Sequence, residues 1–116
     1  KIEYTLESFY RSMSSCIFQL NRKWLPKKMS LLRVVDRRYE TSEILIKFDE
    51  EVDDNWLMLV YLKDNNPSSN IIVEDKTSTE KNISTEYKTN EIFRFSDALV
   101  DSLTAMIDRE YNKKIN

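Results

Sequence analysis

Apolar residues recur at intervals of three and four in two stretches, one near each end of the 116-residue chain. Over residues 6–23 this repeat predicts an amphipathic helix with one apolar stripe. A similar stripe predicts a second helix over about residues 97–112, with Ser96 placed to cap its first turn. The stripes comprise Leu6, Phe9, Tyr10, Met13, Ile17 and Leu20 in the first helix, and Leu99, Val100, Leu103, Met106, Ile107 and Tyr111 in the second.

Three stretches between the helices have the pattern of β-strands. Residues 29–39 alternate only loosely, whereas Ile44, Ile46 and Phe48 share one face of the stretch 43–49. Residues 56–63 are apolar at almost every position, which predicts a central strand that is covered on both faces. The acidic residues 49–55 lack the glycine that a calcium loop needs at its bend, so they predict a solvated turn.

The segment 64–90 has a different composition, with eight Ser or Thr residues, five Asn residues and one Pro. Apart from residues 71–73 it holds few apolar side chains. We therefore expect a polar, flexible insertion, with a short strand at residues 71–74 as its one candidate for regular structure.

This order of elements predicts one α+β domain over residues 1–116. Its small antiparallel sheet would carry the N-terminal and the C-terminal helix on one face, where the apolar stripes are buried. The length is sufficient for a core without disulfides or metals. Because the chain begins at Lys1 and not at Met, we expect it to be a fragment of a longer protein.

Composition argues against catalysis, because the chain contains neither glycine nor histidine. Without glycine there is no phosphate-cradling loop, and without histidine the commonest general base and metal ligand are missing. Cys16 has no histidine to activate it, so we expect it to be a small core residue. For the chain as a whole we expect no cofactor and no metal. Trp24, Trp56 and Tyr61 are more consistent with core packing than with stacking on a ligand.

Positive charge is concentrated in residues 22–38. Seven basic side chains and one acidic one, Asp36, give this segment a formal charge of +6, against −2 for the whole chain. Such a patch attracts lipid headgroups or an acidic protein surface, although a solvated helix end and strand face would explain it equally well. The negative remainder argues against nucleic acid as a partner. The candidate anion- or partner-binding residues are Arg22, Lys23, Lys27, Lys28, Arg33, Arg37 and Arg38.

Hydroxyl side chains in the insertion are candidates for phosphorylation, which adds charge to a flexible segment and docks or releases it. An unmodified spacer is the alternative interpretation. The candidates are Ser68, Ser69, Thr77, Ser78, Thr79, Ser84 and Thr85.

Three stretches of the sequence together resemble kinase-associated domain 1, a domain found at the C-terminus of many Ser/Thr protein kinases. Residues 12–24 (SMSSCIFQLNRKW) are similar to the family's first helix, and residues 44–63 (ILIKFDEEVDDNWLMLVYLK) to its central hairpin. Residues 91–103 (EIFRFSDALVDSL) resemble its aromatic entry into the final helix. The Ser/Thr-rich segment before that helix is most similar to the C-terminal domain of the AMP-activated protein kinase catalytic subunit.

The resemblance implies a non-catalytic regulatory domain. Family members dock on their own kinase domain, seat regulatory subunits or bind anionic phospholipid through basic residues, and residues 22–38 would be the contact surface here. A second hypothesis is a small α+β scaffold subunit that dimerises in a kinetochore-type or other multiprotein assembly through strand 56–62 and its flanking helices. The lone cysteine favours the reducing cytoplasm or nucleus.

Overall fold

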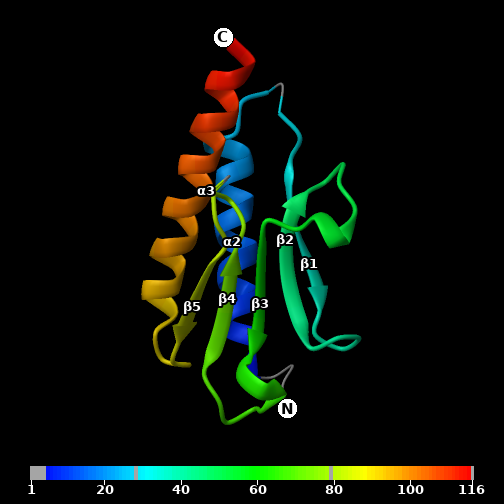
Figure 1. The fold of residues 1–116 in the computed structure, drawn as a ribbon, viewed down its shortest axis with the longest axis vertical. Coiled ribbons are helices and arrows are strands. Elements are labelled where there is room, and N and C mark those ends of the chain that lie inside the picture. The colour runs from blue at the N-terminus through cyan, green and yellow to red at the C-terminus, as the bar shows by residue number, and fades with distance from the viewer. Residues whose placement is uncertain (1–4, 28, 79, 116) are drawn as a thin grey trace.

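The computed structural model describes residues 5–27, 29–78 and 80–115. Two long helices flank a run of five strands in the chain (Figure 1). The elements are α2 (Glu7–Lys23), β1 (Leu32–Arg37), β2 (Glu43–Phe48), η1 (Asp53–Asn55), β3 (Met58–Leu62), η2 (Lys63–Asn65), β4 (Ile71–Asp75), β5 (Ile83–Tyr87) and α3 (Ile92–Ile115).

The five strands form one antiparallel sheet in which each strand pairs with its neighbours in sequence, in the order β1-β2-β3-β4-β5. Both helices pack on the same face of this sheet and run in the same direction, so their C-terminal ends lie at one end of the molecule (Figure 1). The predicted α+β class, with both terminal helices on one face, is confirmed.

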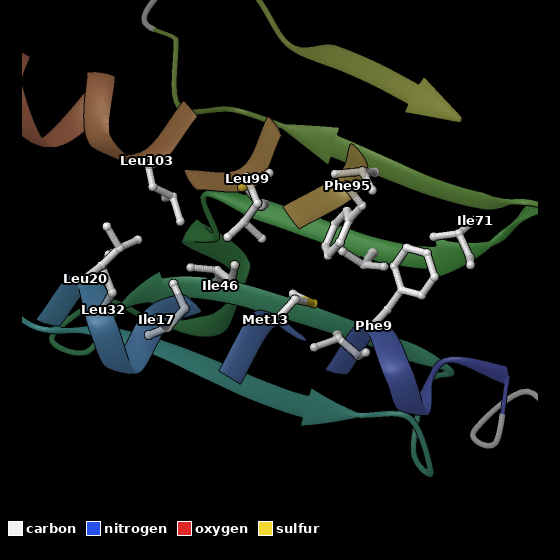
Figure 2. Close-up of a cluster of buried hydrophobic side chains, with 14 of the residues drawn as sticks. Phe9, Met13, Ile17, Leu20, Leu32, Ile46, Ile71, Phe95, Leu99 and Leu103 are labelled. Carbon is white, nitrogen blue, oxygen red and sulfur yellow. The ribbon is translucent and has the colours of Figure 1, made fainter. Parts of the chain in front are cut away.

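The core lies between the two helices and the sheet face that they cover. Phe9 of α2 meets Phe95 of α3 with ring centroids 4.8 Å apart (Figure 2). Tyr87 of β5 contacts Phe95 edge-on. Because helical positions spaced by three and four share a face, one stripe per helix suffices to fill this space. Side chains buried here include Leu6, Met13, Ile17, Leu20, Leu32, Ile44, Ile46, Met58, Val60, Leu62, Ile71, Val73, Leu99, Leu103, Met106 and Ile107.

The prediction that strand 56–63 is covered on both faces is wrong. Met58, Val60 and Leu62 point into the core, but Leu59 and Tyr61 point to the opposite face and are half-buried. No α-helix of the described residues lies on that face; the short 3-10 helix η1 contacts it at β1 and β2. Its apolar centre is a cross-strand row in which Leu45 lies between Val35 and Leu59, and these neighbours, together with the side chains around them, keep Leu45 buried.

The polar segment 64–90 is a β-hairpin and not a flexible insertion. The strand expected at 71–74 is present as β4, and β5 was missed because its sequence, ISTEY, contains only two apolar residues. Turns without glycine are made by residues that tolerate left-handed backbone. Ser42 has φ of 61°, and Asp64 and Asn65 each have φ of 55° in the β3–β4 connection.

The final helix begins at Ile92, so Ser96 does not cap it. The Ser96 hydroxyl donates to the Ile92 carbonyl oxygen at 2.9 Å and contacts the Ser12 hydroxyl of α2. A turn at residues 89–90 precedes α3 instead, and across it the Lys88 N–H donates to the Glu91 carboxylate at 2.8 Å. Ser96 is therefore a polar contact between the two helices.

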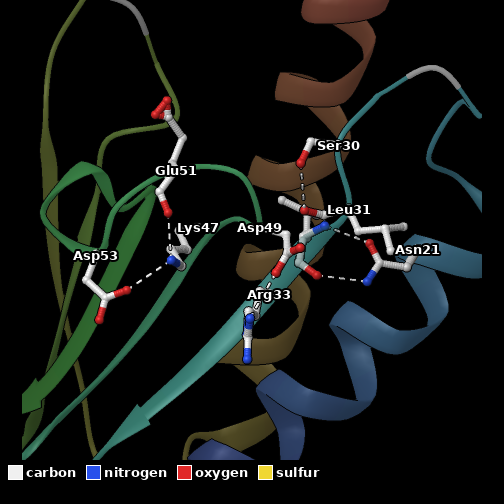
Figure 3. A network of polar contacts seen from close by, with 9 residues as sticks. Asn21, Ser30, Leu31, Arg33, Lys47, Asp49, Glu51 and Asp53 are labelled. Atoms are coloured by element: carbon white, nitrogen blue, oxygen red, sulfur yellow. Dashed lines mark hydrogen bonds and ion pairs between the residues drawn. The ribbon is translucent and has the colours of Figure 1, made fainter.

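Asn21 joins the end of α2 to the edge of the sheet. Its Nδ2 donates to the Leu32 carbonyl oxygen and its Oδ1 accepts from the Leu32 N–H, both at 2.9 Å (Figure 3). The side-chain amide thus pairs with β1 as a neighbouring strand would. It satisfies a donor and an acceptor that otherwise have no partner in β2.

We expect Asn21→Asp to lower the free energy of unfolding by about 1–3 kcal/mol, because a carboxylate cannot donate to the Leu32 carbonyl oxygen. Asn21→Ala removes both hydrogen bonds and should cost a similar amount. Urea unfolding followed by circular dichroism measures the difference. Asn90→Asp, at an exposed position after β5, is the matched control and should leave stability within about 0.5 kcal/mol of the wild type. Equal stability of Asn21→Asp and Asn90→Asp would contradict this role.

Candidate docking surface

Three of the predicted basic residues are exposed together at the C-terminal end of α2. Arg22 and Lys23 form its last turn and Lys27 follows in the loop. The Arg22 guanidinium lies 5.4 Å from the centroid of the Phe18 ring, while no described carboxylate forms an ion pair with Lys23 or Lys27. Lys28 lies outside the described residues. We use the name basic end for this surface, which comprises the exposed residues Phe18, Arg22, Lys23, Trp24, Lys27 and Leu31.

Large apolar side chains are exposed at the same basic end. Trp24 is 61% exposed, Phe18 56% and Leu31 55%. The prediction that Trp24 packs in the core is therefore wrong. Composition gave no signal for this exposure, because the helical stripe ends at Leu20 and the loop that follows has no periodicity.

The loop after α2 is held in place by its own backbone and by two apolar anchors. The N–H groups of Trp24 and Leu25 both donate to the Leu20 carbonyl oxygen, and Met29 N–H donates to the Pro26 carbonyl oxygen at 3.0 Å. Leu25 packs against the core and Met29 is part of it. Leu25 and Met29 point inward, whereas Trp24, just before Leu25, and Lys27, between the two, are left at the surface.

Arg33 and Arg37 lie elsewhere, on the sheet face that the helices leave open. Arg33 pairs with Asp49 at 3.0 Å and Arg37 with Asp53 at 3.6 Å. Lys47 of β2 points to the same face, where its ammonium group contacts Asp53 at 3.0 Å and donates to the Glu51 carbonyl oxygen (Figure 3). The acidic segment 49–55 is thus a turn tied onto β1 and β2 by ion pairs, which neutralise these two arginines.

Arg38 is buried, which removes it from the predicted patch. Its side chain is 7% exposed and forms two hydrogen bonds of 2.9 Å with the Asp36 carboxylate. The guanidinium also lies 3.9 Å from Glu7 and 4.5 Å from the centroid of the Tyr10 ring. Arg38 therefore fastens the end of β1 to the start of α2 and has no free charge to offer a partner.

This ion pair predicts how stability depends on pH. The Arg38 guanidinium lowers the pKa of Asp36 below its ordinary value near 3.9. A carboxyl whose pKa is lower in the folded state stabilises the fold above its unfolded pKa, and this stabilisation is lost as pH falls through the folded pKa. We expect the unfolding free energy to fall below about pH 4, and Asp36→Asn to flatten that part of the curve. Urea titrations between pH 2 and 7 test this, and parallel curves for the two proteins would contradict it.

The hydroxyl residues proposed for phosphorylation occupy different environments. Ser68 and Ser69 lie in the β3–β4 connection, and Ser84 is exposed on β5. Thr77 is buried, and its hydroxyl and N–H both donate to the Asp75 carboxylate, so it is not accessible to a kinase. Ser78, Ser84 and Thr85 are part of or next to the ordered hairpin, and Thr79 lies outside the described residues.

Among the described residues, Cys16 is the candidate thiol nucleophile and the acidic side chains are the candidate metal ligands. Burial raises the pKa of the Cys16 thiol, which disfavours the nucleophilic thiolate. Among residues 5–27, 29–78 and 80–115 no three acidic or cysteine side chains cluster closely enough to hold a metal ion. None of their helices has the length and hydrophobicity to cross a membrane.

Two further aromatic residues pair with charged groups away from the basic end. The Lys76 ammonium group lies 3.7 Å from the centroid of the Trp56 ring, beside a pocket that Glu50 and Glu51 also line. The Tyr61 hydroxyl donates to Glu74, which raises the pKa of Tyr61 to about 12. These contacts satisfy both aromatic side chains within the chain. Large apolar side chains are also exposed away from the basic end, among them Phe93 (83%) and Val52 (70%), but at the basic end the exposed Trp24 lies next to Lys23 in the chain.

Comparison with models of protein families, with curated proteins and with solved structures finds no match to this chain.

Proposed function

We propose that this chain is a non-catalytic docking domain and that its basic end binds anionic phospholipid membrane. The observation that carries the proposal is the exposure of Arg22, Lys23 and Lys27 beside Trp24 at the end of α2. The resemblance described above extends the proposal to a regulatory domain at the C-terminus of a Ser/Thr protein kinase. The order of helix, antiparallel sheet and helix supports that extension.

A membrane surface fits the basic end better than a polyanion does. Basic side chains near an anionic bilayer each contribute about 1 kcal/mol, and an exposed Trp is suited to the headgroup region because its ring is amphipathic. Nucleic acid would offer no apolar phase to Trp24, Phe18 and Leu31. The rest of the chain carries excess negative charge, so an anionic bilayer repels it and orients the domain with the basic end inward.

The wild-type domain should co-sediment with vesicles that contain phosphatidylserine and should not co-sediment with pure phosphatidylcholine vesicles. Raising the salt from about 0.1 M to about 1 M shortens the Debye length from about 10 Å to about 3 Å, so most binding should be lost. Because the chain has no histidine, binding should change little between pH 6 and 8. Equal binding to both vesicle types would contradict the proposal.

Trp24→Ala is expected to weaken vesicle binding by about tenfold, which corresponds to about 1.4 kcal/mol. The loss reflects apolar area that no longer enters the headgroup region. Tyr39→Ala is the matched control, because Tyr39 is 74% exposed in the β1–β2 connection, away from the basic end. Co-sedimentation isotherms compare the two variants. A loss of equal size in Tyr39→Ala would show that Trp24 has no special role.

A further inference from the structure

Both edges of the sheet carry outward-pointing backbone groups, and the edges differ at one end of β1, where a side chain occupies them. At the β1 edge the Asn21 side chain takes both the N–H and the carbonyl oxygen of Leu32. At the other edge the backbone of β5 pairs with β4, and no described group bonds its outer side. An edge strand with free backbone groups is a template for pairing with another strand.

The hydrogen-bond pattern shows which β5 residues present those free groups. Lys63 N–H donates to Asn70, and Lys76 N–H donates to Leu57, so even-numbered β4 residues bond β3. Odd-numbered β4 residues therefore bond β5, through pairs such as Val73 with Thr85. By the same alternation, the N–H and carbonyl groups of the even-numbered residues in β5 point away from the sheet. These residues are Ser84 and Glu86.

We propose that β5 is a homodimerisation edge, at which a second copy of the chain adds its own β5 antiparallel and centred on Thr85. In this register Ser84 faces Glu86 of the second copy, and the two residues exchange two backbone hydrogen bonds. The two-fold symmetry repeats the exchange, so four hydrogen bonds join two sheets into one. The proposal is independent of the lipid-binding function, since the basic end lies on a different part of the molecule.

The sequence of β5 is complementary to itself in this register. Thr85 faces Thr85 and Ser84 faces the Glu86 carboxylate, and both pairs are favourable across antiparallel strands. Ile83, which is 43% exposed, gains Tyr87 of the second copy as a neighbour on the helix-covered face. Centring on Glu86 instead would place two carboxylates opposite each other, which is destabilising. Centring on Ser84 would move Glu86 beyond the end of the facing strand.

The contact area of a strand edge is small, so the dimer should be weak. Interfaces below about 1,200 Å² are typical of transient association. We expect sedimentation velocity to show a monomer at about 10 µM and a substantial dimer fraction at about 1 mM. Ser84→Pro should raise the dissociation constant at least about tenfold, because it removes an outward N–H without breaking a bond to β4. A wild-type monomer at about 1 mM would overturn the proposal, as would a Ser84→Pro dimer of unchanged affinity.

Cysteine cross-linking tests the register without relying on a proline variant. In a Cys16→Ser background, Thr85→Cys should form an intermolecular disulfide under mild oxidation, because residues facing each other in a non-hydrogen-bonded pair have Cα atoms about 4.5 Å apart. Ser84→Cys is the matched control, since its two Cα atoms would be roughly 8–9 Å apart. Selective cross-linking at position 85 supports the proposal. Equal cross-linking at positions 84 and 85 overturns it. So does a dimer that forms no disulfide at position 85, which would indicate association through another surface such as the open sheet face.

Discussion

Reversing Arg22, Lys23 and Lys27 together to glutamate is expected to lower the affinity for phosphatidylserine-containing vesicles by at least about 100-fold. Each basic residue near an anionic bilayer contributes about 1 kcal/mol, so loss of three costs about 3 kcal/mol, and the new carboxylates add repulsion. Because all three side chains are exposed, the variant should fold. A modest loss of stability is expected where glutamate meets the negative end of α2.

The control for this variant reverses three exposed basic residues elsewhere, Arg11, Lys81 and Lys88. It makes the same change in net charge, so long-range repulsion from the bilayer is matched. Vesicle co-sedimentation at low salt should show near wild-type binding for the control. Equal losses in the two triple variants would mean that net charge, and not the basic end, governs binding.

Arg38→Glu is expected to cost about 3–5 kcal/mol of unfolding free energy, the largest single effect on stability that the ion pairs predict. The substitution would place a buried carboxylate beside Asp36 and Glu7, where the guanidinium now bonds one and lies near the other. A domain of this size has about 5–15 kcal/mol of stability in total, so partial unfolding at room temperature is a realistic outcome.

Arg38→Met keeps the prediction measurable if the glutamate variant does not fold. Methionine retains an unbranched apolar side chain against Tyr10 but leaves Asp36 without its partner, so we expect a loss of about 2–3 kcal/mol. Urea unfolding gives both values. Stabilities within about 0.5 kcal/mol of the wild type for both variants would show that Arg38 does not fasten β1 to α2.

The elements that could be predicted from sequence are those in which the spacing of apolar residues matches the positions that the fold buries. Both helices carry long apolar stripes, and Ile44 and Ile46 mark β2 by alternation. β5 could not be recognised, because Ser84 and Glu86 face solvent and Ile83 is only partly covered. Ser96 was misplaced as a cap since its hydroxyl meets Ser12, a residue far away in sequence. Its contact depends on tertiary packing that no local pattern encodes.

The basic end could be predicted in part. Arg22, Lys23 and Lys27 are adjacent in sequence and stay together in space, so charge counting found them. Arg38 and Arg37 belong to the same run of charge, but the fold turns them toward Asp36 and Asp53. Consecutive residues at the end of a strand, such as Arg37 and Arg38, point to opposite faces of the sheet. Arg22 and Lys23 instead share the last turn of a helix. Charge alone cannot distinguish a free cation from one that will meet a distant carboxylate.

Residue-level NMR of the ¹⁵N-labelled domain with phosphatidylserine nanodiscs tests the central claim most directly. We predict that the amide signals of residues 22–31 lose more intensity than those of the sheet, and that phosphatidylcholine nanodiscs leave all signals unchanged. Strongest attenuation in β4 and β5, uniform attenuation along the chain, or no attenuation at all would contradict membrane docking through the basic end.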